Sequence, residues 1–495
     1  MRGFNKIFGG RAGGLVAQAS SLGKLPDHSP KQQLPCRGLV VAGTQSGVGK
    51  TTLVLGLIAA FKRRGLQVQP FKTGPDFIDP GHHTRAAGVA SRNLDGWMLS
   101  KEANLAAFYR QARQAELALV EGAMGLFDGY DGLSEAGSSA EMAKWLNLPV
   151  LLVVDARAMA RSAGALVQGF AKFDPGLTMA GVVFNRVGSP THLAYLRQAL
   201  EPLGITCYGA LPRDREVAIP ERHLGLATTE DHPLGGDYFE HLADLLEAHL
   251  DLGALWEDLP VLTIPLEAGE PDKKPLVRLG VARDNAFCFY YPENLELLAH
   301  YGASLVPFSP MDDRDLPGDL HGLYLGGGYP ELYAERLAAN AGLRRLIKEK
   351  AQSGMPIYAE CGGLMYLSQG IEDLAGNRHP MAGVFPFQVR MLAKRRALGY
   401  REITLTASGL LGPPGTSARG HEFHYSEMVE DPGDLTHLYR ITDRAGVAGV
   451  AEGYALHHVL ASYVHLHFGS NPEVARQLVN RCLEYKKTRR EGTGG

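Results

Sequence analysis

Apolar residues along this chain fall into short runs separated by longer stretches with helical spacing. One such stretch, 50–65, predicts a helix that ends at Gly65. Runs rich in Val and Leu, which predict strands, occupy residues 37–43, 68–74, 115–122, 148–156, 179–187 and 208–214. Because several of these runs are continuously apolar, they are typical of a parallel sheet buried on both faces. The pattern therefore predicts an α/β domain over residues 36–250.

A second α/β series follows a break in this rhythm. Residues 251–275 hold four prolines among mixed charges, which indicates a linker. After Met381 the apolar segments shorten and alternate with polar residues, as antiparallel strands do. We therefore expect a second α/β domain over 276–485 and a polar tail over 486–495. Its predicted strands occupy residues 277–284, 303–310, 322–331, 355–363 and, as the last strand-like run, 459–468.

Residues 1–35 differ from the rest of the chain. They contain five basic side chains and a single acidic one, Asp27, together with several Ser and Gly residues. This composition resembles that of a transit peptide. The alternative, which we favour, is a disordered extension or a start codon upstream of the true one.

Composition excludes several classes of protein. The net charge of −3 gives no reason to expect binding to nucleic acid or to an anionic membrane, and the chain has no apolar run long enough for a membrane span. Cysteines are odd in number and scattered, so we expect neither a disulfide framework nor a zinc site, and a reducing cytoplasm is the expected location. The cysteines are Cys36, Cys207, Cys288, Cys361 and Cys482.

A phosphate-binding loop is predicted between the first strand and the first helix. Residues 43–52 read GTQSGVGKTT, in which Thr44 occupies the position of the first Gly of the strict P-loop pattern. Backbone N–H groups at the start of the helix can bind phosphate oxygens, Lys50 can reach the outer phosphates and Thr51 can offer its hydroxyl to Mg²⁺. The residues expected to bind ATP are Thr44, Ser46, Gly47, Val48, Gly49, Lys50, Thr51 and Thr52.

Acidic residues follow two of the predicted strands. Asp76 and Asp79 come after the second strand, Glu121 ends a buried strand and Asp128 lies in the loop beyond it. Ligands of parallel sheets bind at the carboxyl ends of the strands, so all four are expected on the ATP side. We predict Mg²⁺ ligands at Thr51, Glu121 and Asp76, and substrate contacts at Asp76, Asp79 and Asp128. The alternative is turn chemistry, because Asp is common before Pro and Gly in any loop.

A second chemistry is indicated by residues 358–365, which read YAECGGLM. Cys361 lies between a strand and a helix, where a helix N-terminus can lower the pKa of a thiol and expose it as a nucleophile. The N–H of Gly362 can stabilise an oxyanion, and Gly327 in the GGG of 326–328 is a candidate for the second donor. His465 is the preferred base. Most of the other histidines near it in sequence, which are His421, His424, His457, His458 and His467, are predicted to be surface or core residues.

The two signatures together predict one reaction, in which ATP activates a carboxylate and ammonia cut from glutamine converts it into an amide. The alternative from another class is an ATPase switch of the ParA/MinD type, against which the Cys361/His465 pair argues.

Residues 37–484 resemble the cobyrinate a,c-diamide synthase family of corrinoid biosynthesis. The resemblance rests on the combination of GTQSGVGKTT, FKTGPDFIDPGHH, EGAMGLFDG, AECGGLMYL, RGHEFHYSE and SYVHLHF. It implies a dethiobiotin-synthetase-like ATP domain followed by a class I glutamine amidotransferase domain, with Cys361 as nucleophile and His465 as base. Many class I amidotransferases carry a Glu two residues after this His, where the present chain has His467. Glu422 is a candidate for the missing orienting group.

The resemblance also implies a mechanism and its partners. Cys361 would form a thioester with glutamine and release ammonia, while ATP, with Mg²⁺, would convert an acetate side chain of a cobyrinate-type tetrapyrrole into an acyl phosphate. The a and c acetates would be amidated in turn. The alternatives within the chemistry are cobyric acid synthase, which the KTGPDFID segment disfavours, and the enzyme that amidates Ni-sirohydrochlorin. A homodimer is a candidate assembly.

Overall fold

The computed structural model describes residues 35–492, except 215, 218–220, 223–224, 227–233, 266–273 and 430–434. The described residues belong to one compact unit. Except for Pro35, the extension expected over 1–35 lies outside the described residues.

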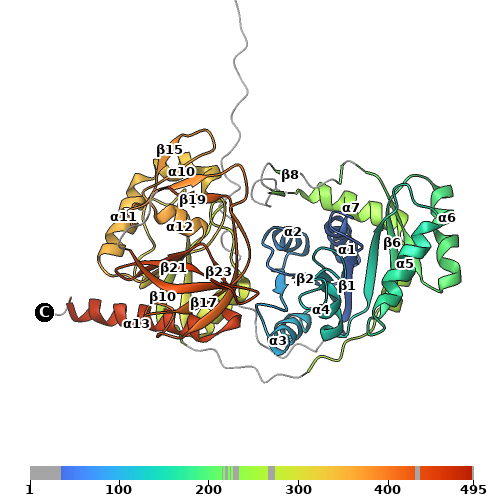
Figure 1. Cartoon of the computed structure of the whole chain (residues 1–495), viewed down its shortest axis with the longest axis horizontal. Coiled ribbons are helices and arrows are strands. Elements are labelled where there is room, and N and C mark those ends of the chain that lie inside the picture. The colour runs from blue at the N-terminus through green and yellow to red at the C-terminus, as the bar shows by residue number, and fades with distance from the viewer. Residues whose placement is uncertain are drawn as a thin grey trace, which may run out of the picture. The chain divides into compact units, whose positions relative to one another are not determined.

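The first half is built on a parallel sheet of seven strands in the order β3-β2-β4-β1-β5-β6-β7 (Figure 1). Neighbouring residues of β1 belong to opposite cores: Leu39 and Val41 pack on one face of the sheet, and Val40 and Ala42 on the other. This is the arrangement that the continuously apolar runs predict. The strands are β1 Arg37–Gly43, β2 Val68–Thr73, β3 Arg92–Leu94, β4 Leu117–Glu121, β5 Val150–Asp155, β6 Met179–Val187 and β7 Cys207–Pro212.

Helices cover both faces of this sheet. The core that contains Leu39 is covered by α1 and α7, and the core that contains Val40 by α3, α4, α5 and α6. The helices are α1 Lys50–Arg63, α2 Ile78–Ala87, α3 Lys101–Ala112, α4 Ser139–Leu146, α5 Ser162–Phe173, α6 Pro190–Leu200, α7 Gly236–His249 and α8 Leu252–Asp258. A 3₁₀ turn Glu201–Leu203 and the short strands β8 Glu221–Arg222 and β9 Gly225–Leu226 complete this half.

The first part of the segment expected to be a linker, residues 251–265, packs on the first half. Helix α8 buries Leu252 and Leu255 in the core of the first half. The N–H of Leu262 donates to the carbonyl of Cys36 at 2.7 Å. The prolines indicated a break between the domains, but the apolar residues among them are enough to hold the first part of the segment on the domain.

The second half is built on a sheet of ten strands in the order β11-β10-β12-β13-β22-β21-β20-β17-β18-β23. Its first five strands are parallel, and pairing becomes antiparallel from β22 to β21 onward. The strands are β10 Val277–Ala282, β11 Ala303–Phe308, β12 Gly322–Leu325, β13 Ile357–Glu360, β17 Ala397–Leu405, β18 Ser417–His424, β20 Thr436–Asp443, β21 Ala448–Leu456, β22 Val459–Ser462 and β23 His465–Leu466.

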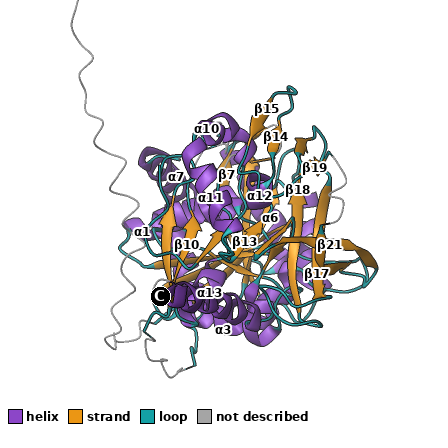
Figure 2. Ribbon diagram, turned by 90° about the vertical axis from the view of Figure 1, so that its left-hand side faces the viewer, coloured by secondary structure: helices purple, strands orange, loops and turns teal. Residues whose placement is uncertain are grey.

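Helices again lie on both faces of the parallel part, as Figure 2 shows in purple against the orange strands. α9 and α13 pack on one face, and α10, α11 and α12 on the other. They are α9 Pro292–His300, α10 Ala334–Ala339, α11 Ala341–Gln352, α12 Gly362–Leu367 and α13 Glu473–Gly492. A small sheet contains β14 Gly370–Glu372, β15 Arg378–Pro380, β16 Val389–Met391 and β19 Ser426–Met428, and 3₁₀ turns occupy Pro330–Tyr333 and Phe468–Ser470.

Two sequence-based expectations about the end of the chain were wrong. The polar tail expected from residue 486 continues helix α13 as far as Gly492. The run 459–468 is two strands rather than one, because buried side chains accept hydrogen bonds from the backbone N–H groups between the two strands. The N–H of Tyr463 donates to Glu452 Oε1 at 2.9 Å, and that of Val464 donates to Ser462 Oγ at 2.9 Å. In the part of the chain that the structure describes, no helix is long and apolar enough to cross a membrane.

Candidate active sites

The predicted phosphate loop joins β1 to α1 with a glycine-dependent backbone. Gly47 and Gly49 have φ values of 74° and 101°, in the left-handed region that favours glycine. A Cβ on Gly49 would lie 2.2 Å from Asn185 Nδ2. Ser46 and Gly47 are exposed, while the side chain of Lys50 is folded inward and donates to the carbonyls of Gln45 at 3.2 Å and Met124 at 2.5 Å. Burial lowers the pKa of Lys50, and the nearby Lys72 ammonium lowers it further.

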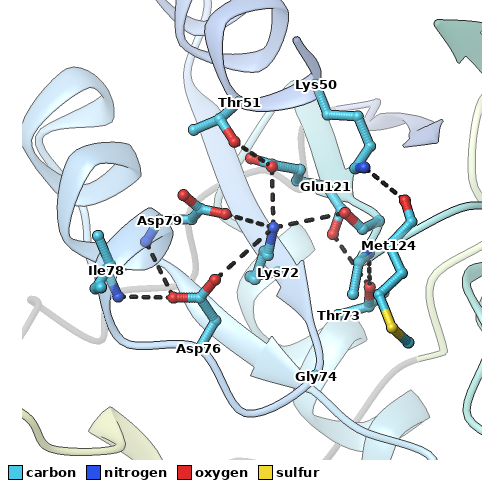
Figure 3. A network of polar contacts seen from close by, with 12 residues as sticks. Lys50, Thr51, Lys72, Thr73, Gly74, Asp76, Ile78, Asp79, Glu121 and Met124 are labelled. Atoms are coloured by element: carbon cyan, nitrogen blue, oxygen red, sulfur yellow. Dashed lines mark hydrogen bonds and ion pairs between the residues drawn. The ribbon is translucent and has the colours of Figure 1, made fainter. Parts of the chain in front are cut away.

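Glu121 is the centre of a buried polar cluster at the start of α1 (Figure 3). Its carboxylate is fully buried and accepts hydrogen bonds from Thr51 Oγ1 at 2.7 Å and Lys72 Nζ at 2.9 Å. His83 Nε2 lies 2.6 Å from its second oxygen. Burial raises the pKa of Glu121, but Lys72 and His83 outweigh that effect and hold the pKa below its usual range. The carboxyl is therefore ionised, and it connects the P-loop threonine to the next strand.

The loop after β2 brings Asp76 and Asp79 to the same cluster. Asp79 Oδ2 accepts from Lys72 Nζ at 2.6 Å, whereas its buried Oδ1 has no hydrogen-bond partner among the described residues. Burial raises the pKa of Asp79 well above its usual value. Asp76 is partly exposed, with Oδ2 4.0 Å from Lys72 Nζ and Oδ1 accepting from the N–H groups of Ile78 at 2.7 Å and Asp79 at 3.2 Å.

Asp128 has a different setting. It is exposed, and its carboxylate accepts from the N–H of Gly125 at 2.8 Å in its own loop. This contact is the turn chemistry that the sequence allowed as an alternative. Asp76, Asp79 and Glu121 thus cluster around Lys72, and Asp128 is not among the groups that bind Lys72.

Sequence reasoning missed four residues of this region: Lys72, His83, Asn185 and Arg186. Asn185 Nδ2 donates to the carbonyl of Val48 at 2.7 Å, and an Arg186 guanidinium nitrogen donates to the carbonyl of Gly47 at 3.0 Å. The available signal was the pair of polar residues within the apolar run of β6. For Lys72 and His83 the signal was their position in the same segment as Asp76 and Asp79. Buried acids require a counter-charge, and these two residues were the basic side chains available nearby.

Cys361 occupies a sharp turn between β13 and α12. Its φ of 46° and ψ of −99° are unusual for a residue other than glycine, and such backbone strain is common at functional sites. The N–H of Cys361 donates to the carbonyl of Ser462 at 2.7 Å, which holds the turn against β22. A Cβ on Gly363 would lie 2.3 Å from the carbonyl oxygen of Leu325, so the close approach of α12 to β12 requires glycine there.

The predicted oxyanion donors lie on neighbouring backbone segments. A Cβ on Gly362 would lie 3.1 Å from the nitrogen of Gly328, which brings the turn after Cys361 next to the glycines after β12. The N–H of Gly327, however, donates to the carbonyl of Phe289 at 3.2 Å. The role predicted for Gly327 therefore requires that bond to open, and the N–H of Gly328 is a neighbouring alternative.

The thiol of Cys361 is buried, and this corrects one expectation. Burial raises the pKa of Cys361, and the negative charge of Glu331 raises it further. Helix α12 has only six residues, so the field at its N-terminus is too weak to reverse the effect of burial. The expectation of a thiol with lowered pKa is wrong for this structure, in which the resting thiol is protonated.

His465 is buried on β23, where it pairs with His421 of β18. Its ring is stacked on that of His421 at 4.9 Å, and a Cβ on Gly327 would lie 2.2 Å from His465 Cε1. Burial lowers the pKa of His465 to about 3, with His424 adding to the effect, so the imidazole is neutral and can accept a proton. Within the described residues, His465 Nδ1 has no hydrogen-bond partner.

The orienting role suggested for Glu422 stays a prediction. Glu422 accepts from Arg401 Nε at 2.7 Å and lies 2.9 Å from His424 Nε2, and its negative charge favours the protonated form of His465, which raises the pKa of that imidazole against the effect of burial. His467, at the position of the usual Glu, has its ring against that of Tyr291 at 4.5 Å.

Glu360 is a buried residue of this site that the sequence did not single out. It precedes Cys361 and accepts from Tyr358 Oη at 2.8 Å, from Tyr324 Oη at 2.9 Å and from the N–H of Leu466 at 3.0 Å. Burial raises the pKa of Glu360 to about 7. Its carboxyl therefore connects the strand before the nucleophile to the residue that follows His465.

Two family models match the two halves of the chain. Residues 39–226 match the CobQ/CobB/MinD/ParA nucleotide binding domain, and residues 278–473 match the CobB/CobQ-like glutamine amidotransferase domain. These matches agree with the α/β architecture and with the two kinds of chemistry that the motifs predicted.

Relatives cover almost the whole chain. The cobyrinate a,c-diamide synthase of Syntrophotalea carbinolica is 48% identical over 456 residues, which are 91% of this chain and 99% of that protein. The enzymes of the same description from Dehalococcoides mccartyi (strain 195) and Priestia megaterium are each 42% identical, over 89% and 92% of this chain and 97% and 99% of theirs. The resemblance carried by the motifs is thereby confirmed, and the chain belongs to the cobyrinate a,c-diamide synthase family.

Proposed function

We propose that this protein amidates the a and c acetate carboxylates of cobyrinate, using ATP and ammonia taken from glutamine. The observation that carries the proposal is the presence, in one chain of this family, of two distinct constellations. In the first, the P-loop threonine is hydrogen-bonded to a buried carboxylate. In the second, the strained turn at Cys361 and the buried neutral imidazole of His465 both lie against the glycines 327–328. It would be a carbon–nitrogen ligase with glutamine as the amide donor.

The glutamine half of the reaction uses Cys361 and His465. Because both groups are neutral at rest, the thiol proton must pass to the imidazole as sulfur attacks the amide carbon. The oxyanion formed is stabilised by the N–H of Gly362 and a second N–H from 327–328. The imidazolium then gives its proton to the leaving ammonia, and water hydrolyses the thioester to glutamate and the free thiol.

The ATP half uses the cluster around Glu121. An acetate oxygen of the substrate attacks the γ-phosphorus, ADP leaves, and ammonia then displaces phosphate from the acyl phosphate to give the amide. Lys50 is positioned by the loop to neutralise the transferring phosphoryl group once its present carbonyl partners are exchanged for phosphate. Lys72 binds both Asp79 and Glu121, at 2.6 Å and 2.9 Å, and so holds the two carboxyl groups together.

Mg²⁺ is the metal that this donor set fits. Thr51, Glu121 and Asp76 supply hard oxygen atoms, and the buried Asp79, whose Oδ1 has no hydrogen-bond partner within the described parts of the chain, lies in the same cluster. We propose that Thr51, Glu121 and Asp76 hold Mg²⁺, directly or through water, and that the ion supplies charge neutralisation for the phosphates. Asp76 and Asp79 remain our candidates for substrate contacts, with Asp128 as the weakest of the three because of its turn contact.

A panel of tetrapyrrole acids tests the substrate. The purified protein would be incubated with ATP, Mg²⁺, glutamine and either cobyrinate, Ni-sirohydrochlorin or cobyrinate a,c-diamide, and products would be separated by mass. We expect cobyrinate to receive two amides. If only Ni-sirohydrochlorin is amidated, that tetrapyrrole is the substrate and the proposal for cobyrinate is wrong. If only the a,c-diamide is amidated, the protein has the activity of cobyric acid synthase.

A further inference from the structure

The side chain of Phe77 connects the two sites. It lies in the loop between β2 and α2, directly after Asp76, yet its ring contacts the amidotransferase half of the chain. Ring-centroid distances are 5.2 Å to His465 and 5.4 Å to His421. On its other sides the ring lies 4.7 Å from that of Tyr291 and stacks on that of Phe289 at 5.2 Å with an interplanar angle of 9°.

The backbone around Phe77 is held by the ATP-site cluster. Asp76 Oδ1 accepts from the N–H groups of Ile78 and Asp79, which fixes the turn that carries the phenyl ring. Asp79 in turn binds Lys72, and Lys72 binds Glu121. A continuous chain of contacts therefore runs from the P-loop threonine, through Glu121 and Lys72, to the residues on both sides of Phe77 (Figure 3).

The histidine at the other end of this chain depends on packing for its orientation. The carboxylate that many class I amidotransferases carry two residues after this His is absent, and Glu422 is engaged by Arg401 and His424. In the described structure nothing hydrogen-bonds His465 Nδ1. The described ring contacts of His465 are those with Phe77 and His421. A ring that is not fixed by a hydrogen bond keeps a catalytic orientation only if its neighbours exclude the other rotamers.

We propose that Phe77 is a positioning residue for His465: the ATP-binding half holds the base of the glutaminase site in place through this ring. The inference rests on the proposed glutamine chemistry, but not on the identity of the tetrapyrrole. It makes glutamine hydrolysis depend on the loop that also carries Asp76 and Asp79, and so gives the two half-reactions a physical link.

The test compares Phe77→Ala, Phe77→Leu and Phe77→Tyr in the full-length protein. Glutamate release from glutamine alone gives kcat and KM without any tetrapyrrole. For Phe77→Ala we expect kcat to fall about tenfold or more, as expected for a misplaced catalytic group, while the KM for glutamine changes by less than about threefold. Phe77→Tyr keeps the ring and should restore most of kcat, and Phe77→Leu, which fills space without a ring face, should be intermediate.

A second readout separates positioning from folding and from substrate binding. In each variant, the rate of cobyrinate amidation with glutamine is divided by its rate with ammonium salt, so the folded fraction cancels. We expect this ratio to fall about tenfold in Phe77→Ala. If Phe77 only packs or only binds the tetrapyrrole, the ratio and kcat for glutamine hydrolysis remain those of the wild type, and the proposal is overturned. Should Phe77→Ala fail to fold, Phe77→Leu carries the same test.

Failure of the proposed function gives a different result. In that case the wild-type protein does not amidate cobyrinate with either nitrogen source, whereas the comparison of glutamine hydrolysis among the Phe77 variants still decides the present proposal.

Discussion

Replacement of Glu121 by Gln tests the polar cluster at the carboxyl end of β4. The change keeps the shape of the side chain but removes a fully buried negative charge that binds Lys72 at 2.9 Å, Thr51 at 2.7 Å and His83 at 2.6 Å. At least one hydrogen-bond donor of these three then loses its acceptor, because an amide offers only one oxygen. The Lys72 ammonium remains buried with Asp79 as its nearest partner.

The cost follows from this geometry. Breaking a buried ion pair by removing one partner costs about 3–5 kcal/mol when the remaining charge is left alone. Lys72 retains Asp79 at 2.6 Å, so we expect Glu121→Gln to lower the free energy of unfolding by about 2–3 kcal/mol, below that range. Amidation should fall about 100-fold or more with either nitrogen source, because Thr51 and the proposed Mg²⁺ site lose their carboxylate.

Two measurements decide the matter. Urea unfolding at neutral pH gives the change in stability, and parallel assays give amidation with glutamine, amidation with ammonium salt and hydrolysis of glutamine. Glu201→Gln, the same change at an exposed glutamate outside both sites, serves as the matched control and should remain within about 1 kcal/mol of the wild type. A Glu121→Gln protein with unaltered stability and near-normal amidation would refute the assignment of Glu121 as the centre of the ATP site.

Three further predictions concern the two sites separately. Cys361→Ser should lose glutamine-dependent amidation by about 1000-fold or more while amidation with ammonium salt persists, and equal loss with both nitrogen sources would contradict two separate sites. Lys50→Ala should reduce amidation about 100-fold with either nitrogen source, and normal turnover would refute the assignment of residues 43–52 as the ATP-binding loop. His467 has a pKa lowered by burial to about 3, so it binds a proton more readily when unfolded and its contribution to stability is lost as pH falls from about 6.5 toward 3. His467→Asn should therefore reduce the slope of unfolding free energy against pH in that window by about 1.4 kcal/mol per pH unit, measured by urea titration at several pH values, and an unchanged slope would contradict the burial of a neutral imidazole.

The parallel strands were predictable from sequence because burial on both faces leaves a continuous apolar run, as at β1 and β6. The three-residue β3 was not, since a strand so short carries no periodicity. The run 459–468 was predicted as one strand because the cause of its break lies elsewhere in the sequence. Glu452, on the neighbouring strand, accepts a hydrogen bond from the N–H of Tyr463.

The sites divide in the same way. The P-loop, Cys361 and His465 were recognisable because their local sequence creates the turn or strand that presents them. Contacts that depend on tertiary pairing were not: Lys72 as the counter-charge to Asp79 and Glu121, and the engagement of Glu422 by Arg401. The pKa of Cys361 was predicted in the wrong direction because sequence shows the helix that follows a thiol, but not how deeply the thiol is buried.

Isotope transfer tests the central claim most directly. Glutamine labelled with ¹⁵N at the side-chain amide is incubated with the protein, ATP, Mg²⁺ and cobyrinate, and the corrinoid product is read by mass spectrometry. The account predicts two ¹⁵N atoms in each product molecule, one at the a and one at the c side chain, and none when ATP is omitted. Hydrolysis of glutamine and ATP without label in the corrinoid, or labelling that does not require ATP, would contradict it.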